Sequence, residues 1–168
     1  MNILNEILAL LQNRVLWTPV AAWLLSQTLK MIVASISARK FQFTRLFGDG
    51  GMPSSHSAFV TSMATMVGWC CGVGSAPFAI AIILAFIVMH DAMGVRRETG
   101  KQAVTIRQLA DAVNAQFLEK DEQIRAEKLK VLVGHSPIQI VMGMLFGILI
   151  AALSLLLFPI GYGAMGAL

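Results

Sequence analysis

Four long apolar stretches, separated by polar connections, dominate the pattern of this chain. They cover about residues 15–37, 57–73, 77–95 and 137–159. A helix needs roughly 20 apolar residues to cross a bilayer, so each stretch has about the length of a transmembrane helix. The pattern therefore predicts an all-α fold, an integral membrane helical bundle of about four transmembrane helices, with residues 1–168 forming a single membrane domain.

Two further segments have helical periodicity without being membrane spans. Apolar residues recur at helical spacing in residues 1–13, which predicts a short amphipathic helix lying on the membrane surface or against the bundle. Residues 96–134 are polar, and within them residues 101–132 carry an apolar stripe. This second segment is predicted to be an amphipathic helix outside the membrane.

The composition agrees with a membrane protein. Hydrophobic residues make up 57% of the chain and charged residues only 13%, whereas soluble domains carry roughly 25% charged residues. The net charge of +4 comes from basic residues that flank the apolar spans. Because no basic patch is interleaved with aromatic residues in the manner of a nucleic-acid site, we expect no nucleic-acid partner.

The basic residues predict the orientation of the bundle. With four spans, residues 38–56 and 96–134 lie on the same side of the membrane. That side holds eleven of the thirteen lysines and arginines: Arg39, Lys40, Arg45, Arg96, Arg97, Lys101, Arg107, Lys120, Arg125, Lys128 and Lys130. The opposite side holds only Arg14. The positive-inside rule therefore predicts a multi-pass protein of the cell inner (cytoplasmic) membrane, with both segments in the cytoplasm.

Candidate chemistry first appears in residues 48–58, Gly-Asp-Gly-Gly-Met-Pro-Ser-Ser-His-Ser-Ala. Glycines permit a close backbone approach, and Pro53 suits the first turn of a helix. A helix N-terminus attracts anions, above all phosphate, and His56 could exchange a proton with an anion held there. The alternative interpretation is a helix start with serine caps and an interfacial histidine.

The predicted topology brings further polar residues to the level of His56. Two histidines, several cations and a helix N-terminus would together form a phosphate site, in which arginine binds phosphate oxygens and histidine acts as nucleophile or acid. The residues expected at this level are His56, His135, Lys30, Asp91, Arg96 and Arg97.

Both of these histidines lie in motifs that resemble those of the type 2 phosphatidic acid phosphatase superfamily, which includes the vanadium haloperoxidases. Pro53-Ser54-Ser55-His56 resembles its Pro-Ser-Gly-His motif, and the segment beginning Gly134-His135-Ser136-Pro137 resembles its His-containing third motif. Lys30 resembles the lysine of its first motif. The arrangement is most similar to the small divergent bacterial branch and covers roughly residues 20–150.

The resemblance implies a metal-independent phosphatase without a cofactor. In it, His135 attacks phosphorus to form a phosphohistidine, while His56 protonates the leaving oxygen and then activates water. The residues that would bind the phosphoryl oxygens are Lys30, Ser54, Ser55, Arg96, Arg97 and Arg45. The implied substrate is a lipid phosphate or diphosphate, polyprenyl diphosphate or phosphatidate-like. The distribution of basic residues, not the resemblance, predicts that it is cleaved on the cytoplasmic face.

Several positions depart from the superfamily pattern. No Arg-Pro follows Lys30 at the expected spacing, and Ser55 replaces a glycine. Gln139 stands where an aspartate would orient the histidine, so we include Gln139 in the catalytic group and consider Asp91, then Glu98, as a substitute carboxylate. Gln139 with Ser136 also has the pattern of a helix capping box.

Other interpretations of the charged residues remain open. Lys30 and Asp91 could form a pair inside the bundle, and Arg96 and Arg97 could be positive-inside anchors. The basic residues near position 40 could face lipid headgroups. The alternative function is therefore a non-catalytic membrane protein that binds an anionic lipid or phosphate in a degenerate phosphatase pocket, with a small anion transporter as a third hypothesis. Partners are the bilayer and a membrane lipid, with a homo-oligomer left open.

Overall fold

The computed structural model describes residues 2–43, 46, 51–117 and 135–162, and within these every regular element is a helix. For residues 95–97, 116 and 117 only the backbone is described. The helices are α1 (Ile3–Gln12), α2 (Arg14–Ala38), α3 (Ser55–Cys71), α4 (Ala76–Met93), α5 (Val95–Phe117) and α6 (Pro137–Leu157).

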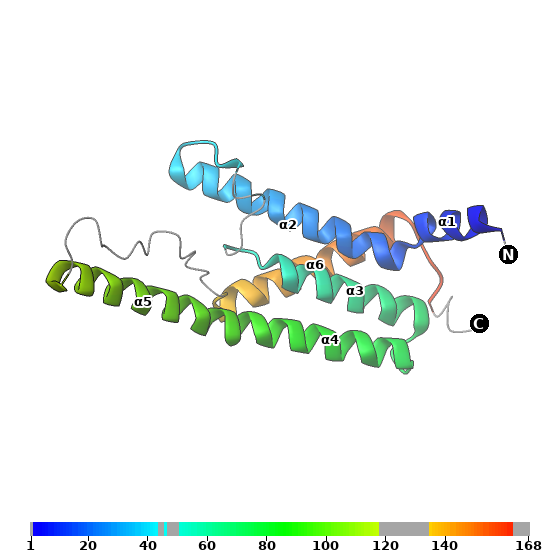
Figure 1. Cartoon of the computed structure of the whole chain (residues 1–168). Coiled ribbons are helices and arrows are strands. Elements are labelled where there is room, and N and C mark those ends of the chain that lie inside the picture. Colours follow the sequence, from blue (N-terminus) through cyan, green and yellow to red (C-terminus); the bar gives the residue numbers. More distant parts are fainter. Residues whose placement is uncertain (1, 44–45, 47–50, 118–134, 163–168) are drawn as a thin grey trace.

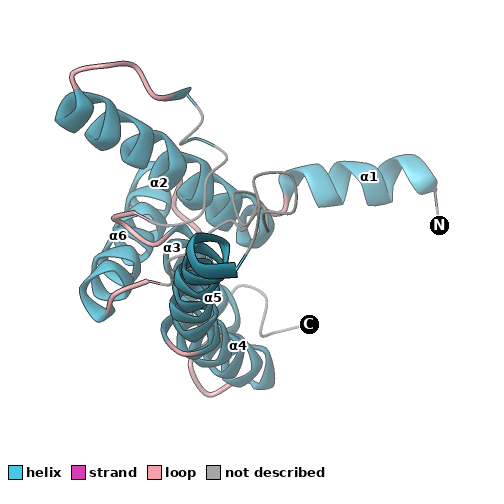
Figure 2. Ribbon diagram, turned by 60° about the vertical axis from the view of Figure 1, so that its left-hand side comes forward, coloured by secondary structure: helices cyan, strands magenta, loops and turns pink. Residues whose placement is uncertain are grey.

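Four of these helices form the bundle, and α3 is its central member. α3 contacts α2, α4 and α6, whereas α4 and α6 barely touch each other. Figures 1 and 2 show α3 enclosed by these three neighbours, with α1 projecting away from them. The helices of the bundle cover the four predicted apolar stretches to within a few residues at each end. The predicted all-α membrane bundle is therefore confirmed.

The distribution of side-chain sizes is that of a bundle surrounded by lipid. Large apolar side chains face outward from α4, including Ile80, Ile83 and Phe86. The interior is built from small or weakly polar residues, among them Ala22, Ser26, Ala58, Ser62, Ala81, Ala85 and Ala151. In a bilayer, helices associate through close packing of small residues, since lipid tails are as apolar as leucine. The outward-facing surface is thus suited to hydrocarbon.

Among the described residues, three helical segments are long and apolar enough to cross a membrane: Arg14–Ala38, Ala76–Ala115 and Pro137–Leu157. The second of these contains α4 and continues into α5. α3 has 17 residues, so its length is about 25 Å against a hydrocarbon core of about 30 Å. The central helix is therefore shorter than the helices that enclose it.

The contact between α3 and α6 is the most extensive of the described element pairs, and it depends on two glycines one helical turn apart. A Cβ added to Gly143 would overlap the carbonyl oxygen of Ser54 and lie 2.9 Å from Ser57 Cβ. A Cβ added to Gly147 would overlap the carbonyl oxygen of Ala58. This Gly-x3-Gly spacing lets the two backbones approach closely.

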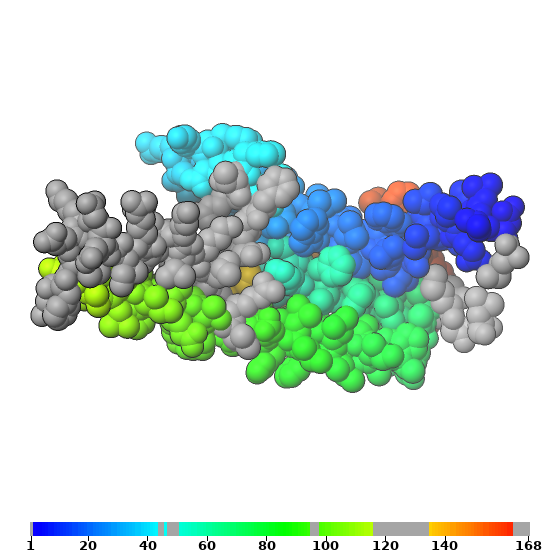
Figure 3. All heavy atoms as spheres, in the orientation of Figure 1, coloured from blue at the N-terminus to red at the C-terminus, as the bar shows by residue number. Residues whose placement is uncertain are grey.

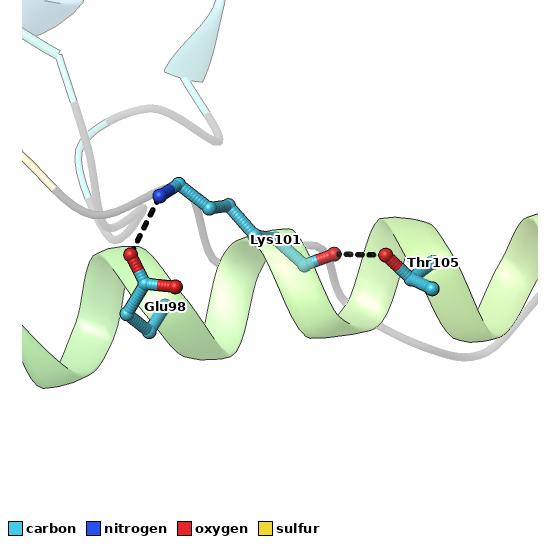
Figure 4. Close-up of polar contacts among 3 residues, drawn as sticks. All are labelled: Glu98, Lys101 and Thr105. Carbon is cyan, nitrogen blue, oxygen red and sulfur yellow. Dashed lines mark hydrogen bonds and ion pairs between the residues drawn. The ribbon is translucent and has the colours of Figure 1, made fainter.

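α4 and α5 run nearly in line, separated by Gly94, so that α5 extends well beyond the other helices (Figure 1). The surface of α5 carries an exposed ion pair, in which Lys101 Nζ lies 2.6 Å from Glu98 Oε1 (Figure 4). Such an exposed pair contributes little stability. α5 coincides with the first part of the segment predicted to be a polar amphipathic helix; residues 118–134 lie outside the described residues.

The opposite end of the bundle is held by Arg14, at the start of α2. Its guanidinium donates to the carbonyl oxygens of Phe158 and Ser154, and to Ser154 Oγ at 2.9 Å. The last carbonyl groups of a helix have no partner within the helix, so Arg14 satisfies those at the end of α6. Figure 3 shows α1 at this end, and the C-terminal part of α2 rising above the body toward the other end.

The glycine contact generates a stability prediction. We expect Gly143→Ala to destabilise the protein by about 1–3 kcal/mol, because its Cβ would meet backbone atoms of α3 that cannot rotate away. Thermal unfolding of the detergent-solubilised protein measures the effect. Gly74→Ala is the matched control, since a Cβ there meets nothing within 4 Å. Equal unfolding temperatures for the two variants would contradict the proposed contact.

Candidate active site

The two motif histidines meet at one end of the bundle. The ring centroids of His56 and His135 are 6.3 Å apart, and the ring planes are nearly perpendicular at 82°. His56 lies in the first turn of α3, and His135 directly precedes α6. His135 is buried, with 3% of its surface exposed, and His56 is half-buried. The site is thus formed at the N-terminal ends of two adjacent helices.

Two backbone hydrogen bonds hold these ends together. The His135 N–H donates to the carbonyl oxygen of Ala92, in the last turn of α4, at 3.2 Å. The Ser54 N–H donates to the carbonyl oxygen of Gln139, in the first turn of α6, at 3.0 Å. Each bond joins segments far apart in the sequence. Together they set the position of His135 relative to α4 and the position of α3 relative to α6.

The start of α3 is fixed locally by serines. Ser54 is the N-cap, and its Oγ accepts hydrogen bonds from the Ser57 N–H at 3.3 Å and from the Ser57 hydroxyl at 3.0 Å. Capping of this kind stabilises a helix by about 1 kcal/mol. Gly51 precedes this turn with a φ of +88°, a conformation that favours glycine, and lies over the Lys30 side chain. The glycine-rich segment thus allows the chain to pass close to Lys30.

Lys30 reaches the site from α2. Its side chain is only 6% exposed, and its Nζ donates to Ser55 Oγ at 2.5 Å and to Gln27 Oε1 at 3.2 Å. Ser55 is the first residue of α3 and the neighbour of His56. The ammonium group therefore lies against the N-terminal turn of α3, where the helix dipole already favours an anion.

The described geometry gives Ser54 a structural task. We predicted that Ser54 binds phosphoryl oxygens, whereas in the structure its N–H donates to the carbonyl oxygen of Gln139 and its Oγ caps α3. The side chain of Ser55 likewise bonds to Lys30 and Gln27. In this structure Ser54 therefore stabilises the N-terminus of α3, and Ser55 binds the Lys30 ammonium.

Gln139 shows the capping-box arrangement. Its Oε1 accepts a hydrogen bond from the Ser136 N–H at 2.9 Å, at the start of α6. This is one of the two interpretations open from the sequence, and it accounts for a glutamine at that position. The role of Gln139 in orienting His135 stays a prediction.

All but one of the other predicted site residues lie near the end of α4 and the start of α5. Asp91 neighbours Ala92 and lines a shallow groove of about 270 Å³ with Phe86, Ile87 and His90. Glu98, the second candidate carboxylate, is exposed and pairs with Lys101 (Figure 4). Arg96 and Arg97 fall in the first turn of α5 by their backbone positions, and Arg45 lies outside the described residues. Their roles stay predictions.

Gln27 is a site residue that the sequence reasoning missed. It is 8% exposed and its Oε1 accepts from both Lys30 and Ser55. The available signal was its spacing: Gln27 precedes Lys30 by three residues, which places both on one face of a helix.

This fold and site define a class: an α-helical membrane protein with paired histidines and a buried lysine at the N-terminal ends of its central helices. The chain belongs to the Divergent PAP2 family, whose model matches residues 11–150. This confirms the resemblance to a divergent branch of the phosphatidic acid phosphatase superfamily. The chain is also 40% identical over 147 residues to the uncharacterized membrane protein YuiD of Bacillus subtilis (strain 168). The aligned residues cover 84% of this chain and 93% of that protein. No solved structure matches the chain.

The cap at Gln139 can be tested by substitution. We expect Gln139→Leu to lower the free energy of unfolding by about 1 kcal/mol, because the Ser136 N–H loses its acceptor. Gln139→Glu should retain the stability of the natural protein, since glutamate also completes a capping box. Thermal unfolding in detergent measures both, and a stable leucine variant would show that the hydrogen bond is not needed.

Proposed function

We propose that this protein is a membrane phosphatase that hydrolyses a lipid phosphate or diphosphate through a phosphohistidine. The observation that carries the proposal is the 6.3 Å separation of the His56 and His135 rings. At this centroid separation the two imidazoles are close enough to contact one phosphoryl group from two sides, which is the arrangement that a nucleophile and its acid–base partner need. Membership of the Divergent PAP2 family supports the same reaction class.

In the proposed first step, His135 attacks the phosphorus atom of the lipid phosphate. A nitrogen–phosphorus bond forms while the bond from phosphorus to the leaving oxygen breaks. His56, starting as imidazolium, donates a proton to that oxygen and leaves as neutral imidazole. The first products are the released lipid alcohol, or a lipid monophosphate from a diphosphate substrate, and phosphohistidine at position 135.

In the second step, water attacks the phosphohistidine. His56 takes a proton from the water as a new phosphorus–oxygen bond forms and the nitrogen–phosphorus bond breaks. Inorganic phosphate leaves, and both histidines regain their starting states. The sum of the two steps is the hydrolysis of one phosphate ester or anhydride bond by one water molecule.

Electrostatic stabilisation dominates phosphoryl transfer, and the site offers two sources of it. The Lys30 ammonium is held 2.5 Å from Ser55 Oγ, at the start of α3. The N-terminal ends of α3 and α6 both point their dipoles into the region of the histidines. Arg96 and Arg97, in the adjacent first turn of α5, are the proposed additional phosphate ligands.

A lipid substrate is supported by apolar cavities on both sides of α6. One, of about 490 Å³, lies between α3, α4 and α6 and includes Thr65, Ile82 and Ile148 in its lining. Another, of about 300 Å³, includes Leu29, Pro53 and Leu149 and reaches the segment that precedes Ser54. The second cavity lies beside the histidine end of the bundle, whereas the first extends toward the turn between α3 and α4 at the opposite end. Both are apolar, which suits the hydrocarbon part of a lipid.

The central test removes the nucleophile. We expect His135→Ala to abolish phosphate release from polyprenyl diphosphate or phosphatidate in purified, detergent-solubilised protein. Quenching the natural protein during turnover with ³²P-labelled substrate should trap an acid-labile phosphohistidine that is missing in the variant. His56→Ala should lower the rate by about 10²–10⁴-fold, the usual contribution of a general acid–base residue.

Substitution of the exposed His90, which stacks on Phe86, provides the matched control. His90→Ala should retain the rate of the natural protein. Unchanged phosphate release in His135→Ala would contradict the proposed mechanism.

A second candidate function is the binding of an anionic lipid without turnover. The observation that favours it is the engagement of Gln139 in the cap of α6, at the position where a carboxylate would raise the basicity of His135. The labelling experiment separates the two functions. Binding of the labelled lipid without a phosphohistidine or phosphate release would select the second.

The proposal places the site on the cytoplasmic face, and accessible cysteines test this orientation. In a protein whose two native cysteines are replaced by alanine, we expect Lys101→Cys to react with a membrane-impermeant maleimide in inside-out vesicles but not in intact cells. Gly74→Cys, in the turn between α3 and α4, should give the opposite pattern. A reversed result for both positions would place the histidines on the outer face.

A further inference from the structure

We propose that Gln27 is a positioning residue that holds the Lys30 ammonium at the phosphate site through a neutral acceptor. The inference rests on the proposed function in assigning Lys30 to phosphate binding. It adds a residue that neither the family motif nor the sequence pattern assigns, and it assigns Ser55 to the same task.

The three side chains form a closed hydrogen-bonded triangle between α2 and α3. Lys30 Nζ donates to Gln27 Oε1 at 3.2 Å and to Ser55 Oγ at 2.5 Å, and Ser55 Oγ donates to Gln27 Oε1 at 3.1 Å. Gln27 is therefore the acceptor at which both donors converge. All three residues are at least nine-tenths buried, with exposures of 8%, 6% and 2% for Gln27, Lys30 and Ser55.

The geometry restricts where the ammonium can go. A lysine side chain has a flexible stem of four carbons and adopts many rotamers when no partner fixes its ammonium group. Here its terminal nitrogen is bonded both to its own helix, through Gln27, and to the first residue of α3, through Ser55. The nitrogen is consequently held beside the residue that precedes His56.

The chemistry of the acceptors matters as much as their position. An amide oxygen and a hydroxyl oxygen are neutral, so they bind an ammonium without cancelling its charge. A carboxylate at position 27 would make the same contacts and would also neutralise the cation. In the low-dielectric interior of a membrane protein, that difference acts directly on the affinity for an anion.

A purely structural role would give a different pattern. Buried polar groups need hydrogen-bond partners, so Gln27 could serve only to satisfy Lys30 and Ser55. Glutamate would satisfy both of them equally well or better. A carboxylate at position 27 lowers the affinity for phosphate under either role, so Gln27→Met separates them. A structural role predicts that the phosphate affinity of Gln27→Met follows its unfolding temperature, whereas a positioning role predicts that the affinity falls by more than the stability does.

The experiment measures the binding of inorganic phosphate to the purified full-length protein in detergent, by calorimetry or phosphorus NMR, together with thermal unfolding. We expect Gln27→Glu to unfold at or above the temperature of the natural protein and to weaken phosphate binding by about tenfold or more. Gln27→Met, which keeps the volume but removes the acceptor, should weaken binding less. Gln102→Glu adds the same charge to an exposed position on α5 and should bind phosphate like the natural protein.

Phosphate affinity of Gln27→Glu equal to that of the natural protein would overturn the inference, as would affinities that simply follow the order of unfolding temperatures. If the glutamate variant does not fold, natural affinity in Gln27→Met overturns it instead. Absence of phosphate binding in the natural protein also overturns it.

Turnover of the lipid phosphate, assayed in the same preparations, tests the proposed function separately. Natural protein that binds phosphate but does not hydrolyse the lipid would remove the proposed function and leave the role of Gln27 standing. A Gln27→Glu protein that hydrolyses the lipid with unchanged KM and kcat would remove the role of Gln27 and leave the proposed function standing.

Discussion

The close approach of α6 to α3 is the constraint on which the rest of the structure depends. Gly143 and Gly147 leave no room for a side chain between the two backbones, so α6 lies directly against the first turns of α3. That approach brings the carbonyl oxygen of Gln139 within hydrogen-bonding distance of the Ser54 N–H and puts His135 beside His56. A larger residue at either glycine would separate the helices and, with them, the two rings.

The interior of this bundle differs from that of a soluble protein because the outside is apolar. Moving a leucine side chain from lipid into the bundle lowers the free energy very little, because both surroundings are apolar. Close packing of small residues and hydrogen bonds therefore determine which helix surfaces come into contact. The buried triangle of Gln27, Lys30 and Ser55 follows this logic, since each member supplies a partner that neither lipid nor an apolar side chain could supply. The same low dielectric strengthens the electrostatic interactions of a charged group such as the Lys30 ammonium.

The structure also separates the parts of the familiar phosphatase pattern that are retained from those that are replaced. The two motif histidines lie side by side, with ring centroids 6.3 Å apart, and a lysine lies at the adjacent helix terminus. The motif serines and Gln139, by contrast, stabilise the starts of α3 and α6. In this member of the Divergent PAP2 family, the two motif histidines and the lysine are present while residues around them differ from the superfamily pattern.

The sequence by itself determined the membrane class, the approximate limits of the bundle helices and the level at which His56 and His135 lie. These features depend on local patterns: apolar runs, proline and serine at helix starts, and the parity of the spans. Only the tertiary structure decided which polar groups pair. The engagement of Ser54 by Gln139, the convergence of Lys30 and Ser55 on Gln27, and the 6.3 Å between the rings depend on how each helix is rotated and how closely it approaches its neighbours. Glycine contacts between helices set that approach, and a one-dimensional pattern does not show which atoms such a contact brings together.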